Sequence, residues 1–213
     1  VRIWAETPPD GLEDEQAEES RRLRKARLAA ECLPFFHRLF AAWDGFLARP
    51  DAQTPTRERA KALRGAGWLA REQCDYAAAS ALLEEGLALG QALEDPRGVA
   101  HALHGLGGIA REQGDFEKAR ERFAGSLELY RDAEDRQGVA VALNSLGLLA
   151  RELGDYPAAR RLYEESLAID RELGDRRSIA VSLNNLGGMA FDQGDFATAC
   201  AQHEESLVIR REL

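Results

Sequence analysis

The sequence repeats itself every 40 residues, and this regularity constrains the fold more than any other feature of the chain. The segment CDYAAASALLEEGLALGQALEDPR begins at residue 74, and GDFEKARERFAGSLELYRDAEDRQ and GDYPAARRLYEESLAIDRELGDRR begin at residues 114 and 154. A catalytic site is usually built once, whereas a unit written several times is typical of a stacked scaffold. Set in rows of 40, the chain shows matching columns without an insertion: Leu63, Leu103, Leu143 and Leu183; Gly67, Gly107, Gly147 and Gly187; Ala70, Ala110, Ala150 and Ala190; Asp75, Asp115, Asp155 and Asp195; Tyr76, Phe116, Tyr156 and Phe196; Ala79, Ala119, Ala159 and Ala199; Leu87, Leu127, Leu167 and Leu207.

Each row is predicted to form two helices, at roughly 59–72 and 76–93 in the first row, because its apolar residues recur at i, i+3 and i+7. The Gly-Asp pair between them indicates a turn. Three glycines are placed where a residue that follows a helix needs a positive φ, and the aspartates after them are placed to cap the second helix: Gly114, Gly154 and Gly194.

Small residues indicate how the two helices of a row pack. The columns of Gly67 and Ala79 are expected to lie where the helices approach most closely, because a larger side chain would push their axes apart. The bulky residues of another column are expected to fill the space toward the next row: Leu83, Phe123, Tyr163 and His203. One hairpin cannot bury its apolar faces alone. We therefore predict an all-α fold, a right-handed solenoid of antiparallel helix hairpins.

The repeat divides the chain into segments. We expect an irregular segment at 1–17, a degenerate capping hairpin at 18–57 with a heavily charged first helix, and four repeats: 58–97, 98–137, 138–177 and 178–213. No polar capping helix follows the last repeat in this sequence, so we expect its stacking face to be covered by further repeats or by another copy.

Composition narrows the class of protein. The chain is 45% hydrophobic and 31% charged with a net charge of −9, an acidic balance that disfavours general binding to nucleic acids or anionic membranes. No apolar run approaches the length of a membrane span. The three cysteines show no CxxC spacing, which favours a reducing compartment and predicts a cytoplasmic location.

No catalytic motif is present in the sequence, so we predict neither enzymatic activity nor a cofactor or metal. His101 and His104 share a helix face and are more consistent with polar residues lining a groove than with metal ligands. Cys74 replaces the turn glycine of its row. The glutamate pairs that recur with the repeat predict a solvated outer face: Glu84–Glu85, Glu164–Glu165 and Glu204–Glu205.

The columns resemble the tetratricopeptide repeat. The resemblance rests on a Leu-Gly pair in the first helix, a small residue three positions later, and then Asp-Tyr or Asp-Phe, Ala and a bulky residue in the second helix. The period of 40 is similar to that of kinesin light chains and of Leu-Gly-Asn-type spindle adaptors. The consensus LxNLGxLAxxxGDYxxAxxLYEESLAIxRELGDRR also looks like bacterial arrays that follow an NTPase domain in transcription regulators. The usual first-helix tryptophan is leucine in all four rows.

The resemblance implies that first helices line a concave surface where ligands bind. Helical spacing at i, i+3, i+7 and i+10 gives one inward position set per row: Lys61, Arg64, Trp68 and Arg71; His101, His104, Gly108 and Arg111; Val141, Asn144, Leu148 and Arg151; Val181, Asn184, Gly188 and Phe191. The side chains grade from basic to Asn and apolar. They suit an acidic peptide, because Arg pairs with carboxylates and Asn bonds to an extended backbone.

Two interpretations of the last-turn arginines remain open. Arg71, Arg111 and Arg151 can bind a ligand in the groove, or they can satisfy helix carbonyls and be neutralised by the glutamates that follow them. The predicted function is non-catalytic protein or peptide binding, as the sensor or docking part of a larger bacterial regulator. The alternatives are self-assembly through the last repeat and binding of a small-molecule effector.

Overall fold

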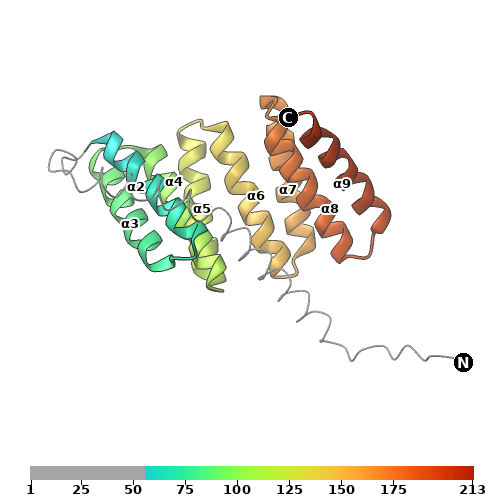
Figure 1. Cartoon of the computed structure of the whole chain (residues 1–213), viewed down its shortest axis with the longest axis horizontal. Coiled ribbons are helices and arrows are strands. Elements are labelled where there is room, and N and C mark those ends of the chain that lie inside the picture. The colour runs from blue at the N-terminus through green and yellow to red at the C-terminus, as the bar shows by residue number, and fades with distance from the viewer. Residues whose placement is uncertain (1–55) are drawn as a thin grey trace, which may run out of the picture.

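Residues 56–213 are described by the structure, a computed structural model, and within that range they form eight helices and no strand (Figure 1). The helices are α2 (Arg57–Glu72), α3 (Tyr76–Ala92), α4 (Pro96–Glu112), α5 (Phe116–Asp132), α6 (Arg136–Glu152), α7 (Tyr156–Leu173), α8 (Arg176–Asp192) and α9 (Phe196–Arg211). They pair in chain order into four antiparallel hairpins, as the all-α solenoid prediction required. The irregular segment and nearly all of the capping hairpin predicted before residue 56 lie outside the described residues.

Aspartates begin almost every helix. In α5, the Asp115 carboxylate accepts a hydrogen bond from the Lys118 backbone N–H at 3.2 Å, and the equivalent aspartates cap α3, α7 and α9 as predicted. The first helices of the later hairpins are also capped by aspartates, which the sequence analysis did not identify: Asp95, Asp135 and Asp175 cap α4, α6 and α8. Gly114, Gly154 and Gly194 adopt φ values of 81°, 77° and 78°, which confirms the predicted left-handed turns.

A glycine of each first helix lies directly under a bulky side chain of its second helix. A Cβ atom at Gly107 would lie 2.7 Å from Phe123 Cδ1, and one at Gly147 would lie 2.8 Å from Tyr163 Cδ1. These distances are shorter than van der Waals contact, so only glycine permits the observed approach. Leu83 also reaches the next hairpin, because a Cβ atom at Gly105 would lie 2.9 Å from Leu83 Cδ1.

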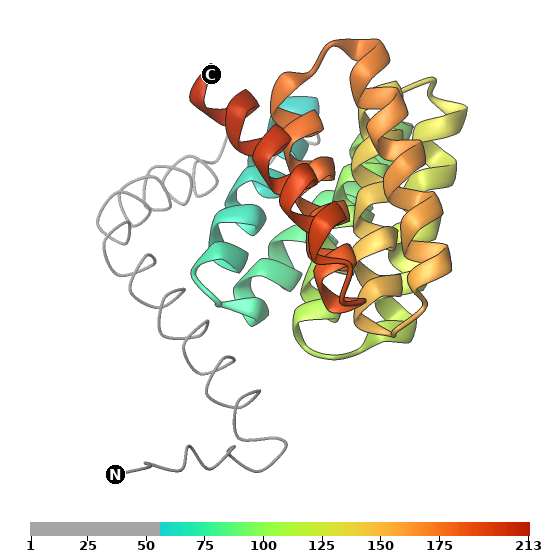
Figure 2. The same ribbon diagram turned by 90° about the vertical axis from the view of Figure 1, so that its right-hand side faces the viewer.

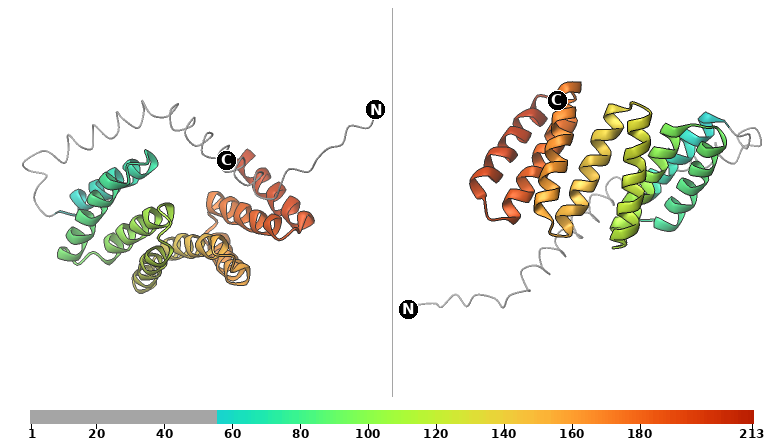
Figure 3. Two further views of the ribbon diagram at one scale, coloured as in Figure 1. Left: turned by 90° about the horizontal axis from the view of Figure 1, so that it is seen from below. Right: turned by 180° about the vertical axis from the view of Figure 1, so that it is seen from behind.

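The hairpins stack along an arc (Figures 2 and 3). Each second helix packs against the first helix of the following hairpin, and neighbouring first helices contact one another along the inner side. The core follows the same path as a chain of clusters, each drawing residues from adjacent hairpins. The described part of the chain contains no helix that combines the length and the apolar composition needed to cross a bilayer.

The paired glutamates are exposed, as predicted, and one of each pair also joins elements. Glu165 and Glu205 form ion pairs with Arg131 and Arg171 of the preceding second helix, at 3.2 Å and 3.3 Å. Glu85 pairs with Arg59 inside the first hairpin. The outer face is therefore both solvated and cross-linked by charge.

A candidate ligand pocket on the concave surface

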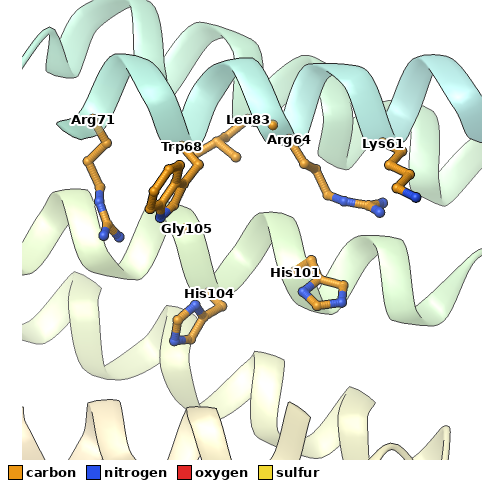
Figure 4. Close-up of a pocket in the computed structure, with 9 residues that line it drawn as sticks. Lys61, Arg64, Trp68, Arg71, Leu83, His101, His104 and Gly105 are labelled. Carbon is orange, nitrogen blue, oxygen red and sulfur yellow. The ribbon is translucent and has the colours of Figure 1, made fainter. Parts of the chain in front are cut away.

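A pocket of about 490 Å³ lies between α2 and α4 on the inner side of the arc (Figure 4). It brings together six of the predicted binding residues, and Gly65, Leu83 and Gly105 complete its wall: Lys61, Arg64, Trp68, Arg71, His101 and His104. Figure 4 shows the four α2 side chains extending toward α4, where the two histidines lie. Spacing of 3, 4 and 3 residues along α2 places all four on one face, because a helix turns once every 3.6 residues.

The apolar part of the pocket comes from Trp68 and Leu83. Leu83 is buried, whereas Trp68 is 51% exposed and offers an aromatic surface at the edge of the pocket. Gly65 and Gly105 add no side chain that would fill the space between the two helices.

The basic part comes from two half-buried arginines that keep unused donors. Arg64 Nη1 lies 4.0 Å from Asp95 Oδ2, and Arg71 Nη2 lies 3.3 Å from Glu72 Oε1. Arg64 Nη1 and Arg71 Nε are nevertheless buried without a hydrogen-bond partner in the part of the chain that the structure describes. Of the described residues 56–213, no carboxylate lines the pocket.

The pKa of each histidine lies below its ordinary value. Burial, with a smaller contribution from the charge of Arg71, lowers the pKa of His104 to about 4. Its Nε2 lies 2.8 Å from the Ser145 hydroxyl, which itself donates to the Val141 carbonyl oxygen at 3.1 Å. The hydroxyl therefore accepts from His104, which places the proton on Nε2 and leaves Nδ1 as an acceptor.

His101 also has a lowered pKa and a hydrogen-bonding partner. Its Nδ1 lies 2.8 Å from the Tyr130 hydroxyl, and burial together with the charge of Arg64 lowers the pKa of His101. Among residues 56–213, no group of three His, Cys, Asp or Glu side chains is arranged to hold a metal ion.

Farther along the groove, the predicted polar residues are engaged by the next hairpin. Arg111 Nη1 lies 2.6 Å from Glu152 Oε1, and Arg151 Nε lies 2.6 Å from Asp192 Oδ2. The Asn144 amide oxygen accepts a hydrogen bond from Asn185 at 2.8 Å. Each of these pairs joins a residue to the one 41 positions later, so the structure favours the ion-pair interpretation for Arg111 and Arg151.

The remaining predicted residues do not join the α2–α4 pocket. Leu148 is packed against the Tyr163 cluster, and Asn184 is exposed. Phe191 is 60% exposed and contacts Phe196 edge to face, with ring centroids 5.4 Å apart.

A second pocket, of about 290 Å³, was not predicted. It lies among α6, α7 and α8, and its lining includes Val141, Asn144 and Val181 of the predicted stripe together with Ser166, Asp170 and Ser182. One repeat position could have indicated this pocket. It is buried in three successive repeats but changes from Gly90 to Tyr130 to Asp170, and a carboxylate at a buried position is unusual.

The fold and its groove define a helical repeat scaffold, and the comparisons with known proteins give its family. Two family models, both described as Tetratricopeptide repeat, match residues 98–172 and 179–213. The chain belongs to the tetratricopeptide repeat family, whose fold generally serves as a non-catalytic scaffold for protein interactions. No curated protein sequence matches the chain.

Solved structures share the fold. BtubC from P. vanneervenii is 21% identical, with 95% of this chain and 92% of that chain covered and a TM-score of 0.61. A Rap protein complexed with Competence and Sporulation Factor is 17% identical with a TM-score of 0.71, covering 83% of this chain and 50% of that chain. A putative kinesin light chain from Podospora anserina is 16% identical with a TM-score of 0.57, covering 93% and 94%. This chain thus spans half the length of the Rap protein, and identities this low establish the fold alone.

Proposed function

We propose that the concave surface binds an extended peptide or protein segment, with an acidic group of that ligand held in the α2–α4 pocket. The observation that carries the proposal is a pair of buried donors, Arg64 Nη1 and Arg71 Nε: within residues 56–213 neither has a hydrogen-bond partner, and no carboxylate of that range lines the pocket beside them. The chain would act without making or breaking bonds, as the sensor or docking part of a larger bacterial regulatory protein in the cytoplasm.

The energetics favour an anionic group. A buried donor without a partner costs about 1–3 kcal/mol, and hydrogen bonds to charged groups contribute about 1.5–3 kcal/mol each. A ligand carboxylate that accepts from the two guanidinium groups would recover that cost. A volume of about 490 Å³ is also within the range of known ligand pockets.

The other lining residues support a peptide in particular. Trp68 offers a half-exposed aromatic surface for an apolar side chain. The neutral His104 keeps an acceptor nitrogen that suits a backbone N–H. The likeness to a Rap protein solved with Competence and Sporulation Factor adds that an array of this fold can hold a ligand.

A second candidate function is self-association through the last hairpin. Leu127 and Leu167 are 8% and 7% exposed because the following hairpin covers them, whereas the equivalent Leu207 is 47% exposed. Phe196 and Val208 are also exposed on α9. We expect a second copy to cover this face, so that the mass in solution rises with concentration and a Leu207→Lys variant stays monomeric. A mass that does not change with concentration would exclude it.

Selection from a random peptide display library tests the main proposal. The bait is the full chain, and we expect the selected peptides to be rich in Asp and Glu beside an apolar residue. The same selection with Arg64→Gln/Arg71→Gln should lose this enrichment. Arg131→Gln/Arg171→Gln removes two charges from the outer face and should keep it. Selected peptides without acidic enrichment, or equal enrichment with both variants, would contradict the proposal. Either result would favour the alternative that the pocket binds a small-molecule effector.

A further inference from the structure

Three equivalent places between successive hairpins are filled differently, and this difference points to a second ligand. Each place is framed by two residues of a second helix and one of the next first helix, at equivalent positions of the repeat. In the first place these residues are Gly86, Gly90 and Gly98, in the second Ser126, Tyr130 and Gly138, and in the third Ser166, Asp170 and Ser178.

The chain fills the first place with its own guanidinium group. The glycines provide the room: Cβ atoms at Gly86 and Gly98 would lie 3.6 Å from Arg64 Cγ and 2.9 Å from Arg64 Nη1. The nearest carboxylate is that of Asp95, which caps α4. A cation therefore fits between two hairpins at this position of the repeat.

The chain fills the second place with an aromatic ring. Tyr130 is 1% exposed, packs directly against Gly138 and meets His101 through its hydroxyl group. The ring therefore occupies the space over Gly138.

The third place is left open. Asp170 is shorter than tyrosine, and the pocket of about 290 Å³ opens beside it. Its lining includes Val141 and Val181, positions of the concave stripe, so the pocket adjoins the surface proposed to hold a peptide.

Asp170 lies at a buried position of this pocket with little compensation for its charge. The residue is 3% exposed, and the Ser182 hydroxyl donates to its Oδ2 at 3.0 Å. The Ser166 hydroxyl donates instead to the Ala140 carbonyl oxygen at 2.9 Å. Burial raises the pKa of Asp170, and the nearby carboxylate of Asp175 raises it further. Arg177, whose side chain is exposed, is the one cation among the lining residues that the structure describes.

We propose that the pocket among α6, α7 and α8 binds a cationic group of a ligand, an ammonium or a guanidinium, against the carboxylate of Asp170. The group would take the place that the Arg64 guanidinium takes in the first hairpin. It would come from a lysine or arginine side chain of a bound peptide or from a free amine. The inference rests on Asp170 and its pocket, and it stands independently of the acidic anchor proposed at α2–α4.

The test uses small probes, so that its outcome does not depend on the α2–α4 pocket. Nα-acetyl-arginine methylamide, Nα-acetyl-lysine methylamide and the neutral isostere Nα-acetyl-citrulline methylamide are titrated into the full chain while backbone amide signals are followed by NMR. We expect the two cationic probes to shift the signals of Ser166, Asp170 and Ser182, and the citrulline probe to bind at least 10-fold more weakly.

Variants assign the effect to one carboxylate. Asp170→Asn should weaken binding of the cationic probes at least 10-fold, and Arg177→Gln should strengthen it by removing a like charge. Glu164→Gln, an exposed carboxylate on the same helix, should leave binding unchanged. Equal binding of charged and neutral probes, or unchanged binding to a folded Asp170→Asn variant, would overturn the proposal.

Agmatine distinguishes the two sources of the cation. Tighter binding of the acetylated arginine probe than of agmatine supports the site and assigns it to a peptide side chain. The reverse order supports the site and assigns it to a free amine.

Discussion

The distance between the two helices of a hairpin depends on a single atom, the Cβ that glycine lacks. Tyr163 and Phe123 are almost completely buried, and each has a glycine of the partner helix beneath its ring. The equivalent glycines of the first and last hairpins, Gly67 and Gly187, lie beneath Leu83 and His203. The bulky residue therefore differs between hairpins, whereas the position beneath it is glycine in each.

Gly107→Ala should therefore destabilise the fold. A Cβ atom at this position meets the buried ring of Phe123, and overpacking of this kind costs about 1–3 kcal/mol, which exceeds the gain of about 1 kcal/mol from alanine in a helix. Gly125→Ala is the matched control, because its Cβ atom would meet nothing closer than Leu103 Cδ1 at 3.6 Å. Urea denaturation should show a loss for Gly107→Ala and a neutral or stabilising effect for Gly125→Ala. Equal effects would contradict the packing argument.

His104 should make stability depend on pH. Its folded pKa is about 4 against an ordinary value of 6.5, so below pH 6.5 the unfolded chain gains a proton that the folded chain takes up only near pH 4. Stability should fall as pH falls through this window, by up to about 3 kcal/mol, since one pKa unit corresponds to about 1.4 kcal/mol. The slope of the free energy of unfolding against pH should be smaller in His104→Gln. His101 contributes in the same direction and remains in that variant, so an unchanged slope would show that His104 is not involved.

Much of the residue-level structure could be predicted from the sequence. The turn glycines and the aspartate caps of the second helices follow from local chemistry that each row repeats. The contact between the glycine column and the bulky column was not predicted, because those bulky residues were expected to face the next row, whereas Phe123 lies over Gly107 of its own hairpin. The role of Asp170 could not be predicted, because whether a carboxylate at that column faces solvent or a pocket depends on the side chains that fill equivalent places, and those differ between rows.

At the scale of helices, polar residues of neighbouring first helices form a ladder with an offset of 41 residues. It contains Arg111–Glu152, Arg151–Asp192, Asn144–Asn185 and His104–Ser145. The sequence analysis identified the first residue of each pair but not its partner, since it compared positions 40 apart. The contacts join residues 41 apart, one more than the repeat period, because one hairpin is shifted against the next. An alignment of repeat positions carries no information about that shift.

The ladder should contribute a measurable but small coupling between hairpins. Arg151 and Asp192 lie 2.6 Å apart with side chains 25% and 33% exposed, and the Asp192 hydrogen bond raises the pKa of Arg151. A double-mutant cycle with Arg151→Gln and Asp192→Asn should give a coupling of about 0.5–1 kcal/mol that decreases with salt. The cycle of Arg151→Gln with Glu204→Gln, which does not contact Arg151 in the structure, should give a value near zero. A coupling of the same size in both cycles would argue against a specific pair.

For the molecule as a whole, an acidic chain presents a locally basic pocket. The net charge is −9, yet Lys61, Arg64 and Arg71 gather on one face of α2, and no carboxylate of residues 56–213 lines the pocket that they face. The solenoid could be predicted from its period. The position of the pocket could not, because it depends on how the next first helix engages each arginine. Glu152 and Asp192 bind Arg111 and Arg151 at 2.6 Å, whereas Asp95 lies 4.0 Å from Arg64 and Arg71 pairs with Glu72 on its own helix.

The most direct measurement is a calorimetric titration of one selected acidic peptide into the full chain, at low and at high salt. The account predicts one peptide per chain, affinity that falls as salt rises, and a loss of about 100-fold in Arg64→Gln/Arg71→Gln, since each lost charged hydrogen bond is worth at least about 1.5 kcal/mol. The outer-face variant Arg131→Gln/Arg171→Gln should bind as the unchanged chain does. Equal affinity for all three proteins would contradict the account.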